Sequence, residues 1–196
     1  RGPRPGHAPV DRAGAAGSLA MAALLQSPAD GQTLALATMS QAVFNAYLFA
    51  KLPYDPQRDL EPIAPLVTGA MALAAHPSLP ASTLSEFVTL AKAQPGKINY
   101  GSSGIGTQFH LSGELLKLLA GINIVHVPYK GTALVYPDMI SGQIQMLFDV
   151  PASALPFIKQ GRVRALAIAG AICTHVPAAV PTVVAAGLAG HDADLW

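Results

Sequence analysis

The stretch "KINYGSSGIGTQFHLSGELLKLLAG", residues 97–121, combines a short β-prone run, a glycine-rich loop and an amphipathic helix. Residues 97–100 favour a strand, and residues 101–107 read Gly-Ser-Ser-Gly-Ile-Gly-Thr. Apolar residues then recur at helical spacing, at Leu111, Leu115, Leu118 and Ile122. A strand, a glycine loop and a helix in this order are typical of α/β proteins that hold an anion at a helix N-terminus.

Short β-prone runs alternate with amphipathic segments along the rest of the chain. We expect strands within residues 33–38, 63–75, 122–127, 143–149 and 164–169. Helices are expected from residue 84 to Pro95-Gly96, up to Gly142, and over residues 153–160. Thr83 and Glu86 have the spacing of a capping box at the start of the first of these helices. The pattern predicts an α/β fold with largely parallel strands.

Three loops are expected at the carboxyl ends of strands: residues 101–107, residues 129–132, and the turn at Asp149. In open α/β sheets ligands bind at that edge, so we expect the three loops to lie together. The glycines of the first loop allow close backbone approach, and its hydroxyl groups and free N–H groups favour an anion. An ordinary glycine-rich turn is the alternative interpretation.

Catalytic motifs fit this stretch poorly. The glycine spacing departs from the nucleophile elbow, the loop lacks the lysine of a P-loop, and Phe109 stands where a dinucleotide loop needs glycine. His110, His126 and Asp149 could form a triad with a serine, but scattered single histidines are more often structural. Paired carboxylates and clusters of His, Cys and Asp are absent from the sequence pattern. We therefore expect no catalytic residues, no metal ligands and no cofactor.

Composition narrows the classes of function. The 196 residues are 51% hydrophobic and 12% charged, which fits one domain or two small ones with a sizeable core. A net charge of +1 gives no electrostatic reason to expect nucleic acid as a partner. The sequence contains no continuous run of about 18 apolar residues, so it predicts no membrane span. The single cysteine, Cys173, cannot form an internal disulfide.

Five stretches resemble a known family: "KLPYDPQRDLEPIAPLV", "INYGSSGIGTQFHLSGELL", "IVHVPYKGTA", "DMISGQIQMLFD" and "ALPFIKQGRVRALAIAG". In this order they are similar to the Bug-type substrate-binding receptors of tripartite tricarboxylate transporters, over residues 12–196. The resemblance implies a periplasmic-binding-protein type II-like fold with two α/β lobes around a ligand cleft. Residues 1–70 would form a partial first lobe, residues 71–171 the second lobe, and residues 172–196 a truncated return to the first. It also implies a fragment that lacks the family's first strand and C-terminal part.

The resemblance further implies an extracytoplasmic receptor rather than an enzyme. Such a receptor works in the periplasm and captures a small carboxylate, such as a dicarboxylate, a tricarboxylate, an amino acid or an aromatic acid. It then passes the ligand to membrane permease subunits. A ligand-sensing regulatory module of the same fold is the alternative, and an acyl-transfer enzyme is a third possibility.

Site residues are implied position by position. The second-lobe anion loop corresponds to Ser102, Ser103, Gly104, Gly106 and Thr107, and the adjoining loop to Tyr129, Gly131 and Thr132. Asp149 corresponds to a cleft residue that meets a polar or cationic group of the ligand. The first lobe would contribute Ser40 and Gln41. Lys130 is expected to face solvent, and Tyr129 either to pack or to bind.

Overall fold

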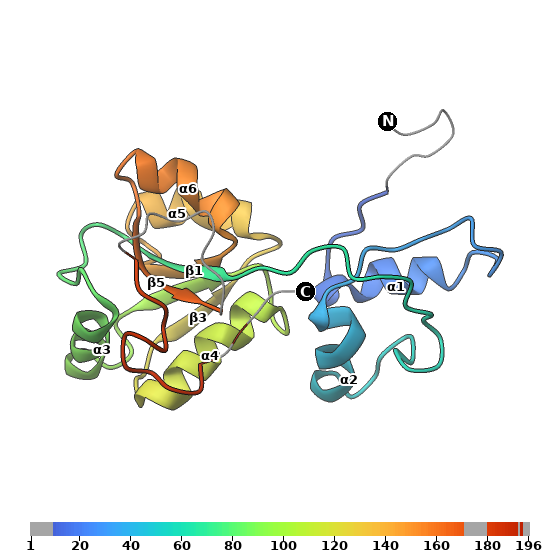
Figure 1. Cartoon of the computed structure of the whole chain (residues 1–196), viewed down its shortest axis with the longest axis horizontal. Coiled ribbons are helices and arrows are strands. Elements are labelled where there is room, and N and C mark those ends of the chain that lie inside the picture. Colours follow the sequence, from blue (N-terminus) through green and yellow to red (C-terminus); the bar gives the residue numbers. More distant parts are fainter. Residues whose placement is uncertain (1–9, 171–179, 192, 194–196) are drawn as a thin grey trace.

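The computed structural model describes residues 10–170, 180–191 and 193, and these form two parts (Figure 1). Residues 10–69 make a small part with short helices. Residues from Met71 onward make a larger part with one five-stranded sheet. An extended segment joins the two parts and leads directly into the first strand.

The sheet contains β1 (Met71–Ala75), β2 (Asn99–Ser102), β3 (Val125–Pro128), β4 (Met146–Asp149) and β5 (Arg164–Ala169), in the order β3-β2-β4-β1-β5. β2 pairs in parallel with β3 and β4, whereas β1 is antiparallel to both β4 and β5. The sheet is therefore mixed, and the expectation of largely parallel pairing is wrong for β1, which runs against both of its neighbours. The reason is that the chain enters β1 from the edge where β2 and β4 end.

Helices cover both faces of the sheet (Figure 1). On one face, α3 (Leu84–Ala93) and α4 (Gln108–Ala120) pack against Met71, Leu73 and Ala75 of β1. On the other, α5 (Val135–Ile140) and α6 (Pro151–Lys159) pack against the alternate residues of β1, Ala72 and Ala74. Because both faces are covered, every residue of β1 is buried, which explains its unbroken apolar sequence.

The predicted capping box begins α3. Thr83 Oγ1 accepts from the Glu86 N–H at 3.2 Å, and Glu86 Oε2 accepts from the Ser82 N–H at 2.6 Å. The first bond satisfies an N–H of the first helical turn, and the second ties the residue before the cap to the helix. The helix ends at Ala93, just before Pro95 and Gly96, as the sequence predicted.

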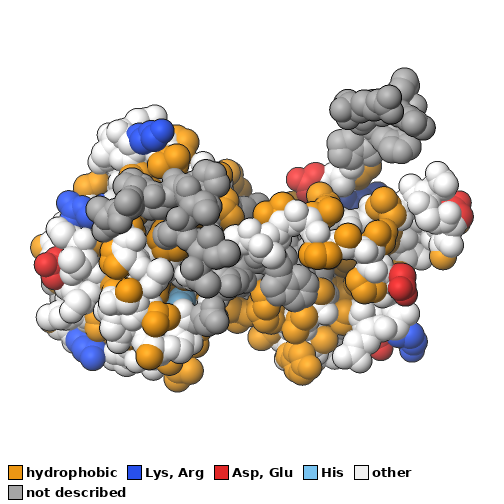
Figure 2. Space-filling view, in the orientation of Figure 1, with side chains coloured by type: hydrophobic (Ala, Val, Ile, Leu, Met, Phe, Trp, Pro, Cys, Tyr) orange, Lys and Arg blue, Asp and Glu red, His pale blue; other side chains and the backbone are white. Residues whose placement is uncertain are grey.

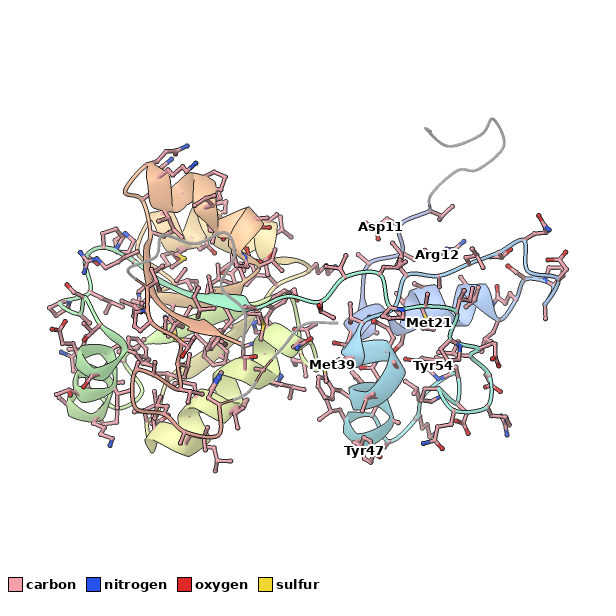
Figure 3. All side chains as sticks on the ribbon, viewed as in Figure 1. Asp11, Arg12, Met21, Met39, Tyr47 and Tyr54 are labelled. Carbon is pink, nitrogen blue, oxygen red and sulfur yellow. The ribbon has the colours of Figure 1, made fainter. Side chains whose placement is uncertain are left out.

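The part formed by residues 10–69 has little core. It contains a 3₁₀ turn (Ala15–Gly17), α1 (Ser18–Leu24) and a π-helical segment (Ser40–Phe44) that runs into α2 (Asn45–Leu48). Within residues 10–69, the buried hydrophobic side chains are Met21 and Tyr54 (Figure 3). Hydrophobic side chains are visible over much of its surface (Figure 2).

Two expected strands differ from the structure. Residues 33–38 are extended but belong to no strand, and Leu34 and Leu36 are 67% and 82% exposed. A β-prone run needs a hydrogen-bonded partner to become a strand, and the described residues place none beside it. Of the expected strand at 63–75, only Met71–Ala75 pairs with neighbours in the sheet.

Residues 180–191 lie against the larger part. Thr182 forms a β-bridge with Ile168, Val183 is buried in the core beneath α3 and α4, and His191 Nε2 lies 3.1 Å from the Ser112 carbonyl oxygen. The apolar side chains of 180–191 complete the core beside β5. The expected return of 172–196 to the first lobe stays a prediction. Residues 172–179, 192 and 194–196 of that expectation lie outside the described residues.

Candidate functional site

The carboxyl ends of β2, β3 and β4 meet at one edge of the sheet. In the parallel register, Ser102 lies beside Pro128 and Gly101 beside Leu147. The Tyr129 N–H donates to the Ser102 carbonyl oxygen at 3.0 Å. The loop at 101–107, the loop at 129–132 and the turn at Asp149 therefore share one edge, as the sequence predicted.

The glycine loop is shaped by close backbone contacts. Thr107 caps α4: its Oγ1 accepts from the His110 N–H at 3.5 Å and donates to the Gly104 carbonyl oxygen at 2.7 Å. Gly104 has a φ of 131°, and a Cβ there would come 3.3 Å from the Tyr129 carbonyl oxygen. Only glycine suits both this dihedral angle and this contact. The loop thus ends at the positive end of a helix dipole, which favours an anion.

The two serines of the loop have different environments. Ser102 is fully buried, and its Oγ accepts from the Gly104 N–H at 3.1 Å and lies 2.6 Å from His126 Nε2. Ser103 is only partly buried, and its hydroxyl makes no hydrogen bond to the residues that the structure describes. Of the two hydroxyls, that of Ser103 is therefore the one available to a ligand.

Tyr129 packs. Its hydroxyl donates to Asp138 Oδ2 at 2.6 Å, and its ring lies against the apolar cluster around Val135. Burial, with help from Asp138, raises the pKa of Tyr129 to about 12. Lys130 is exposed, in line with the expectation that it faces solvent.

Asp149 lies at the expected edge but faces inward. The residue is only 1% exposed. Its Oδ2 accepts a hydrogen bond from the Tyr136 hydroxyl at 2.8 Å, and its Oδ1 accepts one from the Val150 N–H at 2.8 Å. Burial raises the pKa of the Asp149 carboxyl, against the opposite effect of hydrogen bonds that include one from Thr132. In this structure Asp149 joins the end of β4 to Tyr136 of α5 and to Thr132 in the turn before it. Contact with a cationic group of a ligand stays a prediction.

The smaller part approaches the glycine loop at Gly106. A Cβ at Gly106 would come 3.3 Å from Leu48, 3.4 Å from Phe49 and 3.6 Å from the Cβ of Ala16. Ala16 has a φ of 50°, in the left-handed region that alanine rarely adopts. Strained backbone of this kind often occurs at functional sites. The sequence did not single out these three contacts, because they depend on how the two parts pack.

Gln41 holds the turn that contains Ala16. Its Nε2 donates to the Ala16 carbonyl oxygen at 2.8 Å, and its Oε1 accepts from the Thr38 N–H at 2.7 Å. Asn45 Nδ2 donates to the same Ala16 oxygen at 3.2 Å. Ser40, the other predicted first-lobe residue, is 3% exposed. Gln41 thus fixes the backbone that faces Gly106, and direct contact of Ser40 or Gln41 with a ligand stays a prediction.

Two histidines lie beneath the glycine loop. The ring centroids of His110 and His126 are 4.1 Å apart, and the Gly106 N–H donates to His110 Nδ1 at 3.2 Å. Burial lowers the pKa of both imidazoles, and the neighbouring His110 helps to lower that of His126 to about 4. Both rings are therefore neutral at pH 7.

The Ser102–His126 pair does not extend to a catalytic triad. The 2.6 Å separation of Ser102 Oγ and His126 Nε2 would suit a nucleophile and its base. However, Ser102 is 0% exposed, and Asp149, the acid of the expected triad, is bonded to Tyr136 instead. Within the described residues, no group of three His, Cys, Asp or Glu side chains could hold a metal ion.

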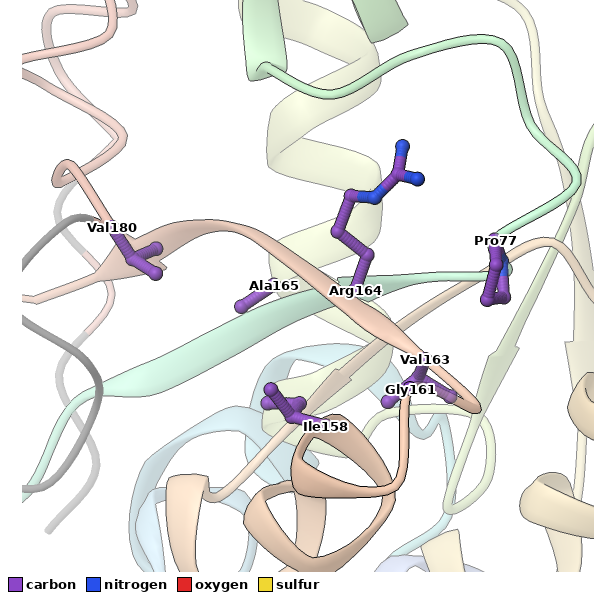
Figure 4. Close-up of a pocket in the computed structure, with 7 residues that line it drawn as sticks. All are labelled: Pro77, Ile158, Gly161, Val163, Arg164, Ala165 and Val180. Atoms are coloured by element: carbon purple, nitrogen blue, oxygen red, sulfur yellow. The ribbon is translucent and has the colours of Figure 1, made fainter.

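Two hollows are lined by residues outside the glycine loop of residues 101–107. One, of about 360 Å³, opens at the opposite edge of the sheet (Figure 4), and its lining is mostly apolar: Pro77, Ile158, Gly161, Val163, Arg164, Ala165 and Val180. The Arg164 guanidinium is already engaged, because it donates to the Ala81 carbonyl oxygen at 2.9 Å. The other, of about 130 Å³, lies between Met39 and Phe44 of the smaller part and Leu111 and Leu115 of α4. Small-ligand sites usually exceed about 300 Å³, so the second is a packing gap.

Comparison with known proteins identifies the fold and the family. The family model described as "Tripartite tricarboxylate transporter family receptor" matches residues 10–196. The chain belongs to this receptor family. It is 32% identical to protein BugT of Bordetella pertussis over 188 residues. These aligned residues make up 95% of this chain and 57% of BugT. The family and its fold are those of solute-binding receptors.

Solved structures of the receptor family agree with this fold. The structure titled "R. palustris Rpa4515 with adipate" has a TM-score of 0.89 and 30% identity, and covers 94% of this chain and 62% of that one. MatC (Rpa3494) from Rhodopseudomonas palustris with bound malate has a TM-score of 0.85 and 31% identity, covering 93% and 62%. This receptor chain thus spans about three fifths of the length of these relatives. In the described part of the chain, no helix is long and apolar enough to cross a membrane.

Proposed function

We propose that this chain is the ligand-capturing part of an extracytoplasmic solute receptor for a small carboxylate. The carboxylate would sit at the glycine loop, between the N-terminus of α4 and the turn that contains Ala16. The observation that carries this proposal is the combination of a capped helix N-terminus with the partly exposed Ser103 hydroxyl at the edge that faces the smaller part. Relatives of similar fold, solved with adipate and with malate, support the same ligand class.

The loop would hold the carboxylate through neutral donors. Residues 101–107 contain no Lys or Arg, so backbone N–H groups, hydroxyls and the helix dipole must supply the attraction. Hydrogen bonds to a charged group contribute about 1.5–3 kcal/mol each. Two or three of them contribute about 3–9 kcal/mol, against about 8 kcal/mol for a micromolar Kd, so contacts to the rest of the ligand must offset the costs of association. Such a site also releases its ligand readily, which suits a carrier.

The family supports a proposal for the partner and the compartment. We propose that the receptor works in the periplasm and delivers its ligand, chemically unchanged, to the permease subunits of a tripartite tricarboxylate transporter. Cell fractionation would place the protein, and uptake of radiolabelled ligand in cells with and without the gene would test delivery. Ligand recovered in altered form after incubation with the pure protein would favour an enzyme instead.

Calorimetry tests the ligand class directly. We would titrate the protein with adipate, malate and citrate, and with adipamide as a matched control that keeps the carbon chain but carries no charge. We expect micromolar binding of at least one acid and none of the amide. Equal binding of adipate and adipamide would place recognition in the apolar chain rather than in the anion loop. Binding of none of the acids would contradict the proposal.

A further inference from the structure

We propose that His110 and His126 are positioning residues for this carboxylate site: as neutral imidazoles they hold residues 102–107 in the binding conformation, and their protonation releases the ligand. The inference rests on the proposed function and adds a regulation to it. Neither side chain needs to touch the ligand. Both ends of the glycine loop are attached to these two rings.

Each end of the loop is bonded to one imidazole. At the start, His126 Nε2 lies 2.6 Å from Ser102 Oγ, and the same oxygen accepts the Gly104 N–H at 3.1 Å. At the end, the Gly106 N–H donates to His110 Nδ1 at 3.2 Å. The two rings also contact each other, with centroids 4.1 Å apart. The bonds to the two histidines therefore fix the orientation of the backbone N–H groups of the loop.

The bond to Gly106 fixes the charge state of His110. A backbone N–H can only donate, so His110 Nδ1 must be an unprotonated acceptor and the ring proton must lie on Nε2. An imidazolium carries N–H on both nitrogens and has no acceptor to offer. Protonation of His110 therefore breaks its bond to Gly106. A second charge on His126 would also face the first across 4.1 Å.

The surroundings add little that could hold an imidazolium in place. On α4, Glu114 Oε1 lies 4.0 Å from His110 Nε2, but Glu114 is already bonded to Lys117 at 2.8 Å and to the Tyr100 hydroxyl of β2 at 2.6 Å. The groups that meet Gly106 from the smaller part, Ala16, Leu48 and Phe49, are uncharged. Burial accordingly lowers the pKa of both histidines.

Acid could change the affinity for the ligand in two opposite ways. Direct attraction between an imidazolium and the nearby ligand would tighten binding as the pH falls, and the ligand would then raise the histidine pKa values. The loop geometry predicts the reverse, because a charged His110 loses its bond to the Gly106 N–H and its charge faces His126. We expect affinity to be constant from pH 8 to about 6.5, the ordinary pKa of histidine, and to fall below that. The fall continues toward the pKa of His126 of about 4.

The variants are matched to the atoms that make the bonds. In His110→Asn the amide oxygen replaces Nδ1, and in His126→Gln the amide replaces Nε2, without a titrating group. With malate as the probe, and adipate as a second, each should keep its affinity at pH 7.5 within about threefold. His110→Leu has no acceptor and should lose about tenfold at that pH. His76→Asn is the control, because His76 Nδ1 bonds to Ser78, at the other end of β1 from the loop.

Proton release on binding, measured by calorimetry in buffers of different ionisation enthalpy, is the deciding readout. The ligand itself releases protons at pH 5, so the double variant His110→Asn/His126→Gln supplies the baseline. We expect the unsubstituted protein to release more protons than this baseline, and its affinity to fall more steeply with acid. If the unsubstituted protein binds malate but releases no more protons than the double variant, this inference alone would be overturned. No binding of malate or adipate at pH 7.5 would overturn the proposed function and the inference with it.

A measurement on the unsubstituted protein covers the case of a variant that fails to fold. Nitrogen-15 spectra report the tautomer and the pKa of each imidazole. We expect His110 to carry its proton on Nε2 at pH 7, and malate to lower the pKa values of His110 and His126. A rise on addition of malate would overturn the proposal.

Discussion

The ring of Tyr100 occupies the space where a side chain on Gly113 would lie: a Cβ at Gly113 would come 2.3 Å from Cε2 of Tyr100. Tyr100 is fully buried in β2, and Gly113 stands in the middle of α4. The missing side chain lets the helix approach the strand. It thereby sets the spacing between the two elements that carry the glycine loop.

Gly113→Ala should destabilise the fold. Alanine is a better helix former than glycine by about 1 kcal/mol, but a methyl group in contact with a buried ring forces the helix or the ring to move. We expect a net loss of about 2 kcal/mol in the free energy of unfolding, measured by urea denaturation. Gly69→Ala is the control, because a Cβ there meets nothing within 4 Å. An unchanged midpoint for Gly113→Ala would contradict the packing described here.

The two loop serines should respond differently to substitution. Ser103→Ala removes a partly exposed hydroxyl and should weaken carboxylate binding about tenfold while the melting temperature stays unchanged. Ser102→Ala leaves His126 Nε2 and the Gly104 N–H without their shared partner, and should cost about 1–3 kcal/mol of stability. Calorimetry and thermal denaturation of both variants separate the two effects. Equal loss of stability in both would contradict the assignment.

Asp149 should make stability depend on pH. Burial raises its pKa in the folded protein, so its contribution is fully present below the ordinary carboxyl value of 3.8 and is lost as the pH rises through the folded pKa. Asp149→Asn removes this dependence. We therefore expect the free energy of unfolding of the variant to improve relative to the unsubstituted protein as the pH increases from 3.8. A constant difference between the two across pH 3.5–7.5 would show that the pKa is not raised.

The exposed apolar segments should promote self-association. Leu34 and Leu36 in one extended segment, and Ile63 and Val67 in another, are all more than half exposed, at 67%, 82%, 76% and 76%. Extended apolar segments without partners tend to pair with other chains. We expect oligomers in sedimentation velocity experiments, and a shift toward monomer in Leu36→Lys/Val67→Lys. Ala165→Lys, which alters the hollow at the opposite edge, is not expected to restore the monomer.

Local patterns predicted much of the larger part. Residues 164–169 form β5 at the predicted bounds, and α3 begins at the capping box of Thr83 and Glu86. The glycine loop and Asp149 also lie at one edge, because parallel strands bring their carboxyl ends together. These features depend on neighbours in the sequence or on a general rule of sheet topology.

Other features depend on contacts between distant residues. The direction of β1 follows from the edge at which the chain enters the sheet, and a five-residue apolar run carries no information about direction. The inward orientation of Asp149 depends on Tyr136, and the Ser102–His126 bond depends on the register of β2 and β3. Residues 33–38 have the composition of a strand, but pairing needs a partner that composition cannot supply.

The position of β1 also has a consequence for how the chain folds. β1 is the first strand in the sequence, yet its partners on either side, β4 and β5, are the last two: Ala72 pairs with Asp149, and Met71 with Ala169. Such distant pairings slow folding, because long loops must close before β1 gains any partner. During synthesis, the wholly apolar β1 leaves the ribosome well before either neighbour exists. Until β4 and β5 have emerged, this apolar segment has neither of its sheet partners and stays open to pairing with other chains.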